Sequence, residues 1–371
     1  LYRQPLKSPR KNPLEKLLEK LLEPQKHLRA KPPSAVRKPP SAPANRQITG
    51  NLMAVLAATH ANITRCAERL RAGDIIALPT ETVYGLAADA TNATAVAAVY
   101  ASKARPKINP LICHVGAPEE AFKLGVFNAS AQSLAARFWP GPLTLVVPRA
   151  AICAVSELAS AGLPTLALRC PDHPVARALL GETARPLVAP SANPSGQLSP
   201  SQAQHVSAHL PDIDVLDGGP CAVGVESTII GCLETEPTLL RAGGLSRDVL
   251  EACLDMTLPE LPENTDRTAR LAPGRMLRHY APRAPLCING AMPEGAYLLL
   301  GFGPNAPEDA VENLSPSGNL NEAAANLFDC LHQLDARAVA EGKAIVVDPV
   351  PTSGLGDAIN DRLKRAAQNE P

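Results

Sequence analysis

The sequence is short of aromatic residues and of long apolar runs. Phe, Trp and Tyr make up 3% of the 371 residues, although apolar residues as a whole make up 45%. The hydrophobic cores must therefore be built from aliphatic side chains. No apolar run approaches the roughly 20 residues that a membrane-spanning helix requires. The sequence thus predicts no membrane partner.

Several motifs of metal and nucleotide sites are also missing. The nine cysteines include no Cys-x-x-Cys pair, and the eight histidines show no His-Glu-x-x-His spacing. No Gly-x-x-x-x-Gly-Lys-Ser/Thr loop is present, so a P-loop is not indicated. We therefore predict no metal site. An odd number of cysteines, several of them inside apolar runs, indicates reduced thiols and a cytoplasmic location.

The charge is balanced overall but unevenly distributed. Residues 1–52 carry 12 Lys and Arg against 3 Asp and Glu, whereas the remaining residues carry 24 against 33. The globular part is therefore mildly acidic. This balance argues against a protein that binds nucleic acid over its whole surface.

The composition divides the chain into four parts. Residues 1–52 form a basic extension with nine prolines, which we expect to be disordered or to be an artefact of a mis-set start codon, with Met53 the true initiator. Residues 53–254 are predicted to form the main domain. Residues 255–283 lose their periodicity and carry four prolines, as linkers do. Residues 284–371 are predicted to form a small second α/β domain.

In the main domain, apolar runs typical of buried strands alternate with segments typical of helices. This alternation predicts an α/β (α+β-like) domain with a mixed sheet and flanking helices. A long loop is expected at residues 79–93, before a helix that Asn92 or Thr94 caps and that runs to about Lys103. The other predicted strands are 74–78, 111–115, 143–147, 165–168, 187–189, 228–230, 297–300 and 344–347. The other predicted helices are 63–71, 129–137, 174–180, 200–209, 246–254, 320–334 and 357–367.

A basic turn lies between the helix that ends near residue 103 and the next strand. Lys103, Arg105 and Lys107 fall within five residues. Cations are favoured at a helix C-terminus, so these side chains could simply be solvated. The alternative is an anion site, because an Arg fork and a Lys point charge together suit a polyphosphate. Asn109 could add a neutral donor and acceptor.

Hydroxyl and cationic side chains recur where other predicted strands begin or end. Ser191–Gly196 follows an apolar run, Gly224–Ile230 opens a strand with a hydroxyl pair, and Arg169 and Arg241 each end a strand. Each of these segments alone is ordinary turn chemistry. Together they describe a cationic, hydroxyl-rich cleft at the strand ends, where open α/β sheets bind ligands.

Eight segments carry a resemblance to a known family, in one order over about residues 61–371. They are PTETVYGL, KARPKINPLICHV, LRCPDHP, APSANPSGQLSPS, GVESTII, LLRAGG, APGRMLRHYAP and GLGDAINDRL. The chain thereby resembles the YrdC-type threonylcarbamoyl-AMP synthases, in the longer form with a C-terminal domain. The resemblance implies a twisted open sheet around a concave positive cleft, and a Rossmann-like C-terminal domain.

The resemblance also implies a reaction and its partners. L-threonine, bicarbonate or CO₂, and ATP would give threonylcarbamoyl-AMP and pyrophosphate. ATP would be a substrate that carries Mg²⁺, and no tightly bound cofactor is implied. The product would pass to a threonylcarbamoyl-transferase machinery that modifies adenosine 37 of tRNAs that read codons beginning with A. Direct contact with tRNA is a further implied possibility.

Residue roles follow from the same resemblance. The positions that match threonine contacts are Thr82, His114, Arg169, Ser191 and Ser227. The positions that match nucleotide contacts are Lys103, Arg105, Asn109, Thr165, Asn193, Ser201, Arg241 and Tyr280. Lys103 and Arg105 would be catalytic, because cations stabilise the charge that develops on the attacked α-phosphate. No general base is identified.

Three positions bear on how well the family pattern fits this chain. Tyr280 lies in the linker, so a nucleotide contact there predicts that the linker folds back as a lid. Ser201 and Ala242 replace the threonine and proline that are more usual in the family.

Three alternative functions remain open. They are a non-catalytic tRNA- or dsRNA-binding module with the same fold, a carbamoyltransferase of the hydrogenase-maturation kind, and a regulatory protein that kept the site. The second would need zinc modules with Cys-x-x-Cys pairs, which the chain lacks.

Overall fold

The structure is a computed structural model that describes residues 55–259, 279–288, 290, 293 and 295–368. The predicted extension 1–52 and residues 260–278 of the predicted linker lie outside the described residues. Within the described ranges, no helix is both long enough and apolar enough to cross a membrane.

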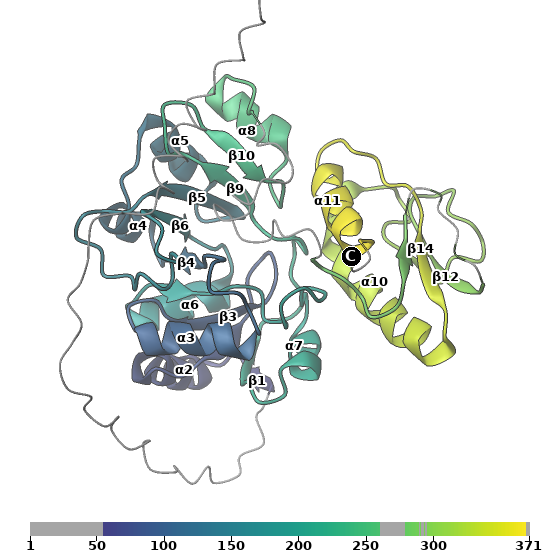
Figure 1. The fold of residues 1–371 in the computed structure, drawn as a ribbon, viewed down its shortest axis with the longest axis horizontal. Helices are drawn as coiled ribbons and strands as arrows, with labels where there is room; N and C mark the ends of the chain where they lie inside the picture. Colours follow the sequence, from purple (N-terminus) through teal and green to yellow (C-terminus); the bar gives the residue numbers. More distant parts are fainter. Residues whose placement is uncertain (1–54, 260–278, 289, 291–292, 294, 369–371) are drawn as a thin grey trace, which may run out of the picture. The chain divides into compact units, whose positions relative to one another are not determined.

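A ten-stranded mixed sheet forms the main domain, with the strand order β1-β8-β2-β3-β7-β4-β6-β5-β9-β10 (Figure 1). Adjacent strands are parallel in some pairs, such as β4 with β6, and antiparallel in others, such as β4 with β7. The predicted mixed sheet is confirmed. The strands are β1 (Val55–Ala57), β2 (Ile76–Leu78), β3 (Gly85–Asp89), β4 (Ile112–His114), β5 (Leu143–Pro148), β6 (Thr165–Arg169), β7 (Leu187–Val188), β8 (Val215–Asp217), β9 (Thr228–Gly231) and β10 (Thr238–Arg241).

Helices pack against this sheet in two groups. Helices α2, α3 and α6 lie together, with α2 against α6 and α3 against β3, while α5 packs on β5 and α8 on α5 (Figure 1). Helix α3 begins where the sequence predicts, because the Asn92 side chain accepts hydrogen bonds from the N–H groups of Thr94 and Ala95. The helices are α2 (His60–Ala72), α3 (Ala93–Ser102), α4 (Pro118–Leu124), α5 (Ala129–Phe138), α6 (Pro174–Thr183), α7 (Ala203–His209) and α8 (Arg247–Leu254).

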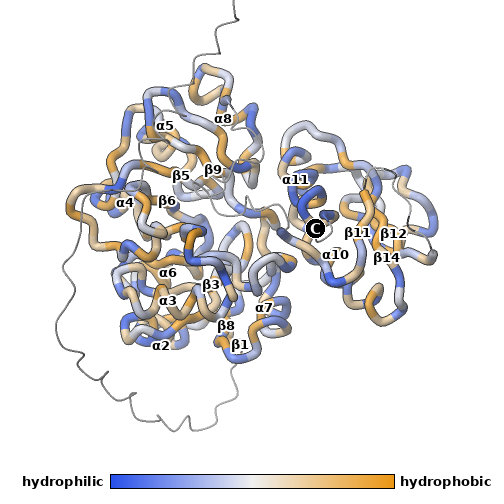
Figure 2. The backbone as a smooth tube through the Cα atoms, viewed as in Figure 1, coloured by the Kyte–Doolittle hydropathy of each residue, from blue (hydrophilic) through white to orange (hydrophobic). Residues whose placement is uncertain are grey.

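The C-terminal domain has its own four-stranded sheet, in the order β11-β14-β12-β13, and all its strand pairs are parallel. Its middle strands are strongly apolar (Figure 2), as strands of a parallel sheet usually are. The predicted α/β fold class thus holds for this part of the chain as well. Its elements are β11 (Leu286–Cys287), β12 (Tyr297–Gly301), β13 (Glu312–Asn313), α10 (Leu320–Glu341), β14 (Ala344–Val347) and α11 (Gly356–Ala366).

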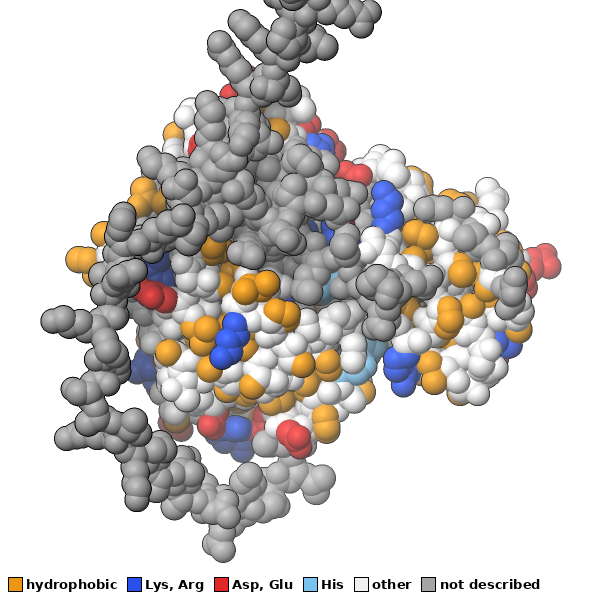
Figure 3. All heavy atoms as spheres, viewed as in Figure 1, with side chains coloured by type: hydrophobic (Ala, Val, Ile, Leu, Met, Phe, Trp, Pro, Cys, Tyr) orange, Lys and Arg blue, Asp and Glu red, His pale blue; other side chains and the backbone are white. Residues whose placement is uncertain are grey.

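Charged side chains of the described residues are dispersed over the face that Figure 3 shows. Lys and Arg stand singly there, among acidic, apolar and uncharged groups. Nucleic-acid-binding surfaces usually cluster their cations on one face or along one helix. The visible face does not have that pattern.

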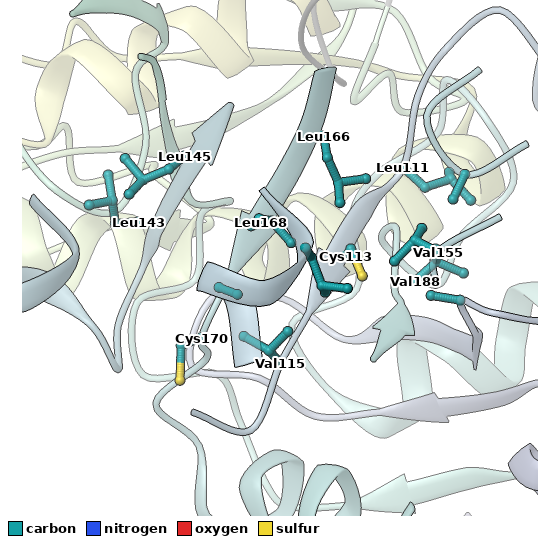
Figure 4. Packing of buried hydrophobic residues seen from close by; sticks show 14 of the residues in the cluster. Leu111, Cys113, Val115, Leu143, Leu145, Val155, Leu166, Leu168, Cys170 and Val188 are labelled. Carbon is teal, nitrogen blue, oxygen red and sulfur yellow. The ribbon is translucent and has the colours of Figure 1, made fainter. Parts of the chain in front are cut away.

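The core of the main domain is aliphatic, as the scarcity of aromatic residues requires. Leu111, Cys113, Leu166 and Leu168 pack together on the neighbouring strands β4 and β6 and their flanks (Figure 4). Fully burying one such leucine contributes roughly 1.5–3 kcal/mol. All nine cysteines lie within the described residues and carry free thiols.

The prediction of a loop at residues 79–93 is wrong for the middle of that segment, because Gly85–Asp89 forms strand β3 between β2 and β7. The run Gly-Leu-Ala-Ala-Asp lacks β-branched residues, so local propensity does not reveal a strand. The segment becomes a strand because it pairs with β2 and β7. A Cβ atom added at Gly85 would lie 3.0 Å from the Ala189 Cβ, so the small residue permits the close approach.

Several helix limits also differ from the prediction, among them those of α2, α6, α7 and α10. Helix α7 begins at Ala203, not at Pro200. Helix α10 continues past residue 334 to Glu341, where Gly342 ends it in the left-handed conformation at a φ of 65°. The apolar periodicity persists over this extra length, since Leu334 and Ala338 are buried.

Candidate active site

The polar ends of neighbouring strands meet at one edge of the large sheet. His114, the last residue of β4, is paired with Arg169, the last residue of the parallel strand β6. Paired residues of adjacent strands direct their side chains to the same face. The chain leaving β7 then forms a bridge between Ser191 and Gly85. The register therefore gathers loops from distant parts of the sequence around His114 and Arg169.

These loops surround a cavity of about 50 Å³. Eight of the residues predicted from the sequence line it: Thr82, Arg105, His114, Arg169, Ser191, Ser227, Arg241 and Tyr280. The remaining lining is Val83, Leu111, Ile112, Ala189, Pro190, Glu226 and His279. The sequence reasoning missed the two ionisable members of that set, Glu226 and His279. The cavity thus combines three guanidinium groups, one carboxylate and two imidazoles.

Arg169 is held in place by its own domain. Its Nη2 lies 2.8 Å from Glu81 Oε1, and its Nε donates to the Gly141 carbonyl at 3.3 Å. The exposed fractions of the two charged side chains are 5% and 9%, so the ion pair is shielded from water. An arginine fixed in this way keeps part of its fork for a carboxylate ligand.

His114 is a neutral imidazole beside that arginine. Burial, together with the nearby charge of Arg169, lowers the pKa of His114 to about 3. Its Nδ1 is buried, and it makes no hydrogen bond within the described part of the chain. A neutral imidazole offers one donor and one acceptor to a polar ligand.

The hydroxyl groups of the cavity are oriented by other hydroxyl groups. Thr82 Oγ1 lies 2.8 Å from Thr80 Oγ1, and Ser227 Oγ lies 2.7 Å from Thr144 Oγ1. All four side chains are buried. Each pair fixes one hydroxyl while leaving lone pairs for a ligand, so the hydroxyl side of the cavity is pre-arranged.

Arg105 and Arg241 supply two further cations. Arg105 donates from Nε to the Asn109 carbonyl at 3.3 Å and from Nη2 to the Pro110 carbonyl at 3.1 Å. Arg241 donates from Nη2 to the Ser227 carbonyl at 2.9 Å. Burial lowers the pKa of both, that of Arg105 to about 10, so Arg105 stays charged at neutral pH. Two buried like charges on one cavity favour an anion there.

Tyr280 does reach the cavity, although it lies far along the chain from the sheet. Its side chain is 1% exposed, and its ring centroid is 4.0 Å from that of His279. The next residue, Ala281, donates from its N–H to the Gly196 carbonyl at 2.8 Å. His279 and Tyr280 therefore form one wall of the cavity.

Comparisons with known proteins show which family the chain belongs to. A family model for Sua5, YciO and YrdC proteins, described as "Telomere recombination", matches residues 68–243, and one described as "Threonylcarbamoyl-AMP synthase, C-terminal domain" matches residues 245–368. A Bacillus subtilis protein named threonylcarbamoyl-AMP synthase is 38% identical over 330 residues, which cover 82% of this chain and 92% of that relative. The chain belongs to the threonylcarbamoyl-AMP synthase family.

A further relative and a solved structure extend the likeness. A Pyrococcus abyssi protein of the same name is 37% identical over 317 residues, which cover 80% of this chain and 92% of that relative. The crystal structure of P. abyssi Sua5 complexed with L-threonine matches with a TM-score of 0.78 at 35% identity. That match covers 85% of this chain and 97% of the solved chain. The resemblance inferred from eight short segments is confirmed.

Among the family positions, Lys103 does not line the cavity. Its Nζ donates to the Asn193 carbonyl and, at 2.5 Å, to the Ser191 carbonyl. The side chain is 1% exposed, and burial, followed by the charge of Arg105, lowers its pKa well below the usual value. Lys103 thus fastens the end of α3 to the loop that carries Ser191.

Asn109 and Thr165 lie outside the cavity lining as well. Asn109 is buried in the basic turn, where its carbonyl accepts a hydrogen bond of 2.9 Å from the Tyr100 hydroxyl. Thr165 begins β6, at the end of the strand opposite Arg169, and pairs with Pro148. Both residues are buried, and both remain predictions as nucleotide contacts.

Asn193 and Ser201 belong to the loop that Lys103 fastens. Asn193 Nδ2 donates to the carbonyls of Pro194 and Gln197, each at 2.9 Å, so its amide mainly shapes the loop. Ser201 Oγ lies 3.5 Å from His205 Nδ1. Neither lines the cavity, and both remain predictions as nucleotide contacts.

The same loop is joined to the C-terminal domain through histidines. The rings of His205 on α7 and His332 on α10 are stacked, with centroids 3.9 Å apart. His332 Nε2 forms a hydrogen bond of 3.1 Å with the Ser199 carbonyl. The C-terminal domain therefore contacts the loop between Ser191 and Ser201 directly.

Proposed function

We propose that the chain is an L-threonylcarbamoyladenylate synthase. It would join L-threonine, bicarbonate or CO₂, and ATP to give threonylcarbamoyl-AMP and pyrophosphate. One observation carries the proposal in particular: a single cavity is lined by Arg169, which Glu81 holds in place, and by two further buried arginines, Arg105 and Arg241. This set suits a ligand that has both a carboxylate and phosphates. Membership of the family supports the same reaction.

The amino-acid half of the cavity is formed by Arg169, His114 and the hydroxyl groups. Arg169 would bind the threonine carboxylate with the part of its fork that Glu81 and Gly141 leave available. Thr82, Ser191 and Ser227 would bind the remaining polar groups. Because His114 is neutral, it adds no charge that would repel the substrate ammonium.

The nucleotide half is formed by Arg105, Arg241 and Tyr280. A triphosphate would neutralise the two buried guanidinium groups, whose repulsion lowers the pKa of Arg105 after the larger effect of burial. Such preplaced cations stabilise charge that develops on the α-phosphate during attack by the carbamate oxygen. Lys103 would act indirectly, by holding the loop that carries Ser191 next to this half of the cavity.

The carbamate itself requires little chemical assistance, since amines and CO₂ combine without a catalyst. The protein would work mainly by holding the carbamate and the α-phosphate together. Effective molarities for such positioning are worth roughly 7–11 kcal/mol. In the described cavity lining, Glu226 is the one carboxylate, and it already accepts hydrogen bonds from Ser199 and Arg362. These residues do not form a Mg²⁺ site, so we treat Mg²⁺ as part of the Mg–ATP substrate.

The present cavity is too small for both substrates, since ligand pockets usually enclose about 300–1,000 Å³. The wall formed by His279 and Tyr280 would therefore move aside to admit ATP and return to exclude water. This extends the predicted lid to the described residues 279 and 280. We propose that the product passes to a tRNA-modifying threonylcarbamoyl transferase, which places the protein in the cytoplasm.

The decisive experiment measures pyrophosphate release from ATP by the purified chain. We expect release that requires both threonine and bicarbonate, together with a threonylcarbamoyl-AMP product identified by mass. Release that does not depend on threonine would contradict the proposal. Salt-sensitive tRNA binding without any release would favour the RNA-binding alternative.

A further inference from the structure

Arg362, on the last helix of the C-terminal domain, is the largest fully buried side chain of the described residues. Its exposed fraction is 0%. A buried guanidinium is very unfavourable unless its charge and its donors are matched. The partners that match Arg362 are not confined to its own domain.

The first partner is Glu226, which lines the cavity. Arg362 Nε donates to Glu226 Oε2 at 2.9 Å, and Ser199 Oγ donates to the other carboxylate oxygen at 2.6 Å. Burial alone raises the pKa of Glu226, but the charges of Arg362 and Arg241 outweigh it and hold that pKa below its usual value. Arg362 therefore keeps an ionised carboxylate in the cavity wall.

The second partner is the turn after Arg241. Arg362 Nη1 donates to the Ala242 carbonyl at 2.6 Å. Arg241 immediately precedes that carbonyl and is itself bonded to Ser227. Ala242 replaces a proline that is more usual in the family, so no proline ring fixes the backbone of this turn. The hydrogen bond from Arg362 restrains it instead.

The third partner is the ring of Tyr280. The Arg362 guanidinium carbon lies 5.4 Å from the ring centroid, within the range of a cation–π contact. Phe328 on α10 contacts the same ring, with centroids 5.8 Å apart. Two helices of the C-terminal domain thus hold the tyrosine that forms a wall of the cavity.

We propose that Arg362 is a positioning residue through which the C-terminal domain shapes the nucleotide half of the active site. It does not line the cavity, and it acts through Glu226, the turn at Ala242 and the ring of Tyr280. The proposal rests on the proposed function, because it names ATP as the ligand of that half. The amino-acid half has its own buried pair, Arg169 with Glu81, so threonine binding does not depend on Arg362.

The test compares wild type with Arg362→Met in the full chain, by steady-state pyrophosphate release and by calorimetric binding of each substrate. Methionine keeps the length of the side chain but removes the charge and the donors. We expect the KM for ATP to rise at least tenfold, which corresponds to about 1.4 kcal/mol. The KM for threonine should stay within twofold of wild type. Arg362→Lys keeps the charge next to Glu226 but loses the bond to Ala242, so it should recover part of the ATP affinity.

A second variant covers the case in which Arg362→Met fails to fold. Arg362→Met combined with Glu226→Gln removes both buried charges, so neither is left unpaired. We expect this double variant to unfold at a temperature close to wild type and still to bind ATP at least tenfold more weakly. The matched control is Arg337→Met on α10, whose side chain is 51% exposed and paired with Glu341. It should leave both KM values unchanged.

The outcomes separate this proposal from the proposed function. Equal losses for threonine and ATP, or lower thermal stability with unchanged ATP binding, would make Arg362 a purely structural residue and overturn the inference. If wild type releases no pyrophosphate, the proposed function fails instead. The inference is then decided by calorimetric ATP binding alone.

Discussion

Two buried Arg–Glu pairs flank the cavity, and they are built differently. Arg169 and Glu81 both belong to the main domain, at the end of β6 and in the loop after β2, with 2.8 Å between Nη2 and Oε1. Arg362 and Glu226 are 136 residues apart and join the C-terminal domain to the main domain, with 2.9 Å between Nε and Oε2. Removing one partner of a buried pair typically costs 3–5 kcal/mol.

The difference indicates which half of the proposed site the main domain completes alone. The proposed amino-acid half takes His114 and Arg169 from β4 and β6, the counter-ion Glu81 from the loop after β2, and its hydroxyl groups from the segments next to β2, β7 and β9, all in the main domain. The nucleotide half takes Arg105 and Arg241 from the main domain but depends on the C-terminal domain for the surroundings of Tyr280 and Glu226. Variants on each side should therefore affect one substrate more than the other.

The largest effect is expected from Arg105→Ala, on the nucleotide side. Losing one preplaced cation at the developing charge typically lowers kcat by 10²–10³, or about 2.7–4 kcal/mol. Threonine binding should change little. The control is Lys107→Ala, because Lys107 lies two residues away on the same basic turn but is exposed. Activity of Arg105→Ala near wild type would rule out the proposal that Arg105 stabilises charge on the α-phosphate.

On the amino-acid side, Arg169→Met should raise the KM for threonine about 100-fold, since charged hydrogen bonds contribute about 1.5–3 kcal/mol. ATP binding measured without threonine should stay near wild type. Arg177→Met is the control, since that side chain is 52% exposed and pairs with Asp172. A larger loss of ATP binding than of threonine binding would reverse our assignment of the two halves.

A fall in pH should weaken the contact that His332 makes between the domains. Burial lowers the pKa of His332 to about 3. The folded protein binds this proton less readily than the unfolded chain, whose histidine pKa is about 6.5, so stability is lost as the pH falls below about 6.5. His205, His209 and Arg283 add to the unfavourable charge around His332. Asp329, which pairs with His205, is the nearby acidic group.

The expected loss between pH 7 and pH 5 is on the order of 2 kcal/mol of unfolding free energy from His332 alone. Denaturant unfolding of wild type and of His332→Gln at the two pH values measures it. The glutamine variant should lose stability less steeply on acidification, while His114 and His279 contribute equally to both proteins. Identical slopes for the two proteins would show that His332 does not titrate in this way.

The smallest effect is expected from Glu81→Gln, which keeps the shape of the side chain but leaves Arg169 without its counter-ion. We expect the KM for threonine to rise about tenfold, or about 1.4 kcal/mol, with the KM for ATP unchanged. Glu119→Gln, at an exposed position on α4, is the control. If the KM for ATP rises as much as the KM for threonine, the pairs Arg169–Glu81 and Arg362–Glu226 do not act on separate substrates as we infer.

Much of the site could be predicted because its residues end apolar strands. His114 and Arg169 stand where apolar runs stop, and their pairing follows from the parallel strands β4 and β6. Glu226 lies in a segment whose hydroxyl pair is its only local signal of a ligand site, so the sequence does not single out the carboxylate. Its importance comes from Arg362, which the sequence shows only as one cation on an amphipathic helix.

Other features follow from tertiary structure that local patterns do not contain. Lys103 has the residue type of a phosphate ligand, but two carbonyl groups hold it outside the cavity lining. Strand β3 has no strand-like composition and exists because β2 and β7 pair with it. Tyr280 could be placed at the site only through the family resemblance, since no periodicity connects it to the sheet.

The backbone of Tyr280 limits how firmly the cavity can shut. Its φ is 61°, in the left-handed region that a non-glycine residue adopts at a cost of roughly 1–3 kcal/mol. The ring contacts with Arg362 and Phe328 must outweigh this strain in the structure. The opening proposed above would release the strain, so part of the energy for opening would be stored in the closed form. Such storage would favour rapid exchange of substrate and product over a long-lived complex.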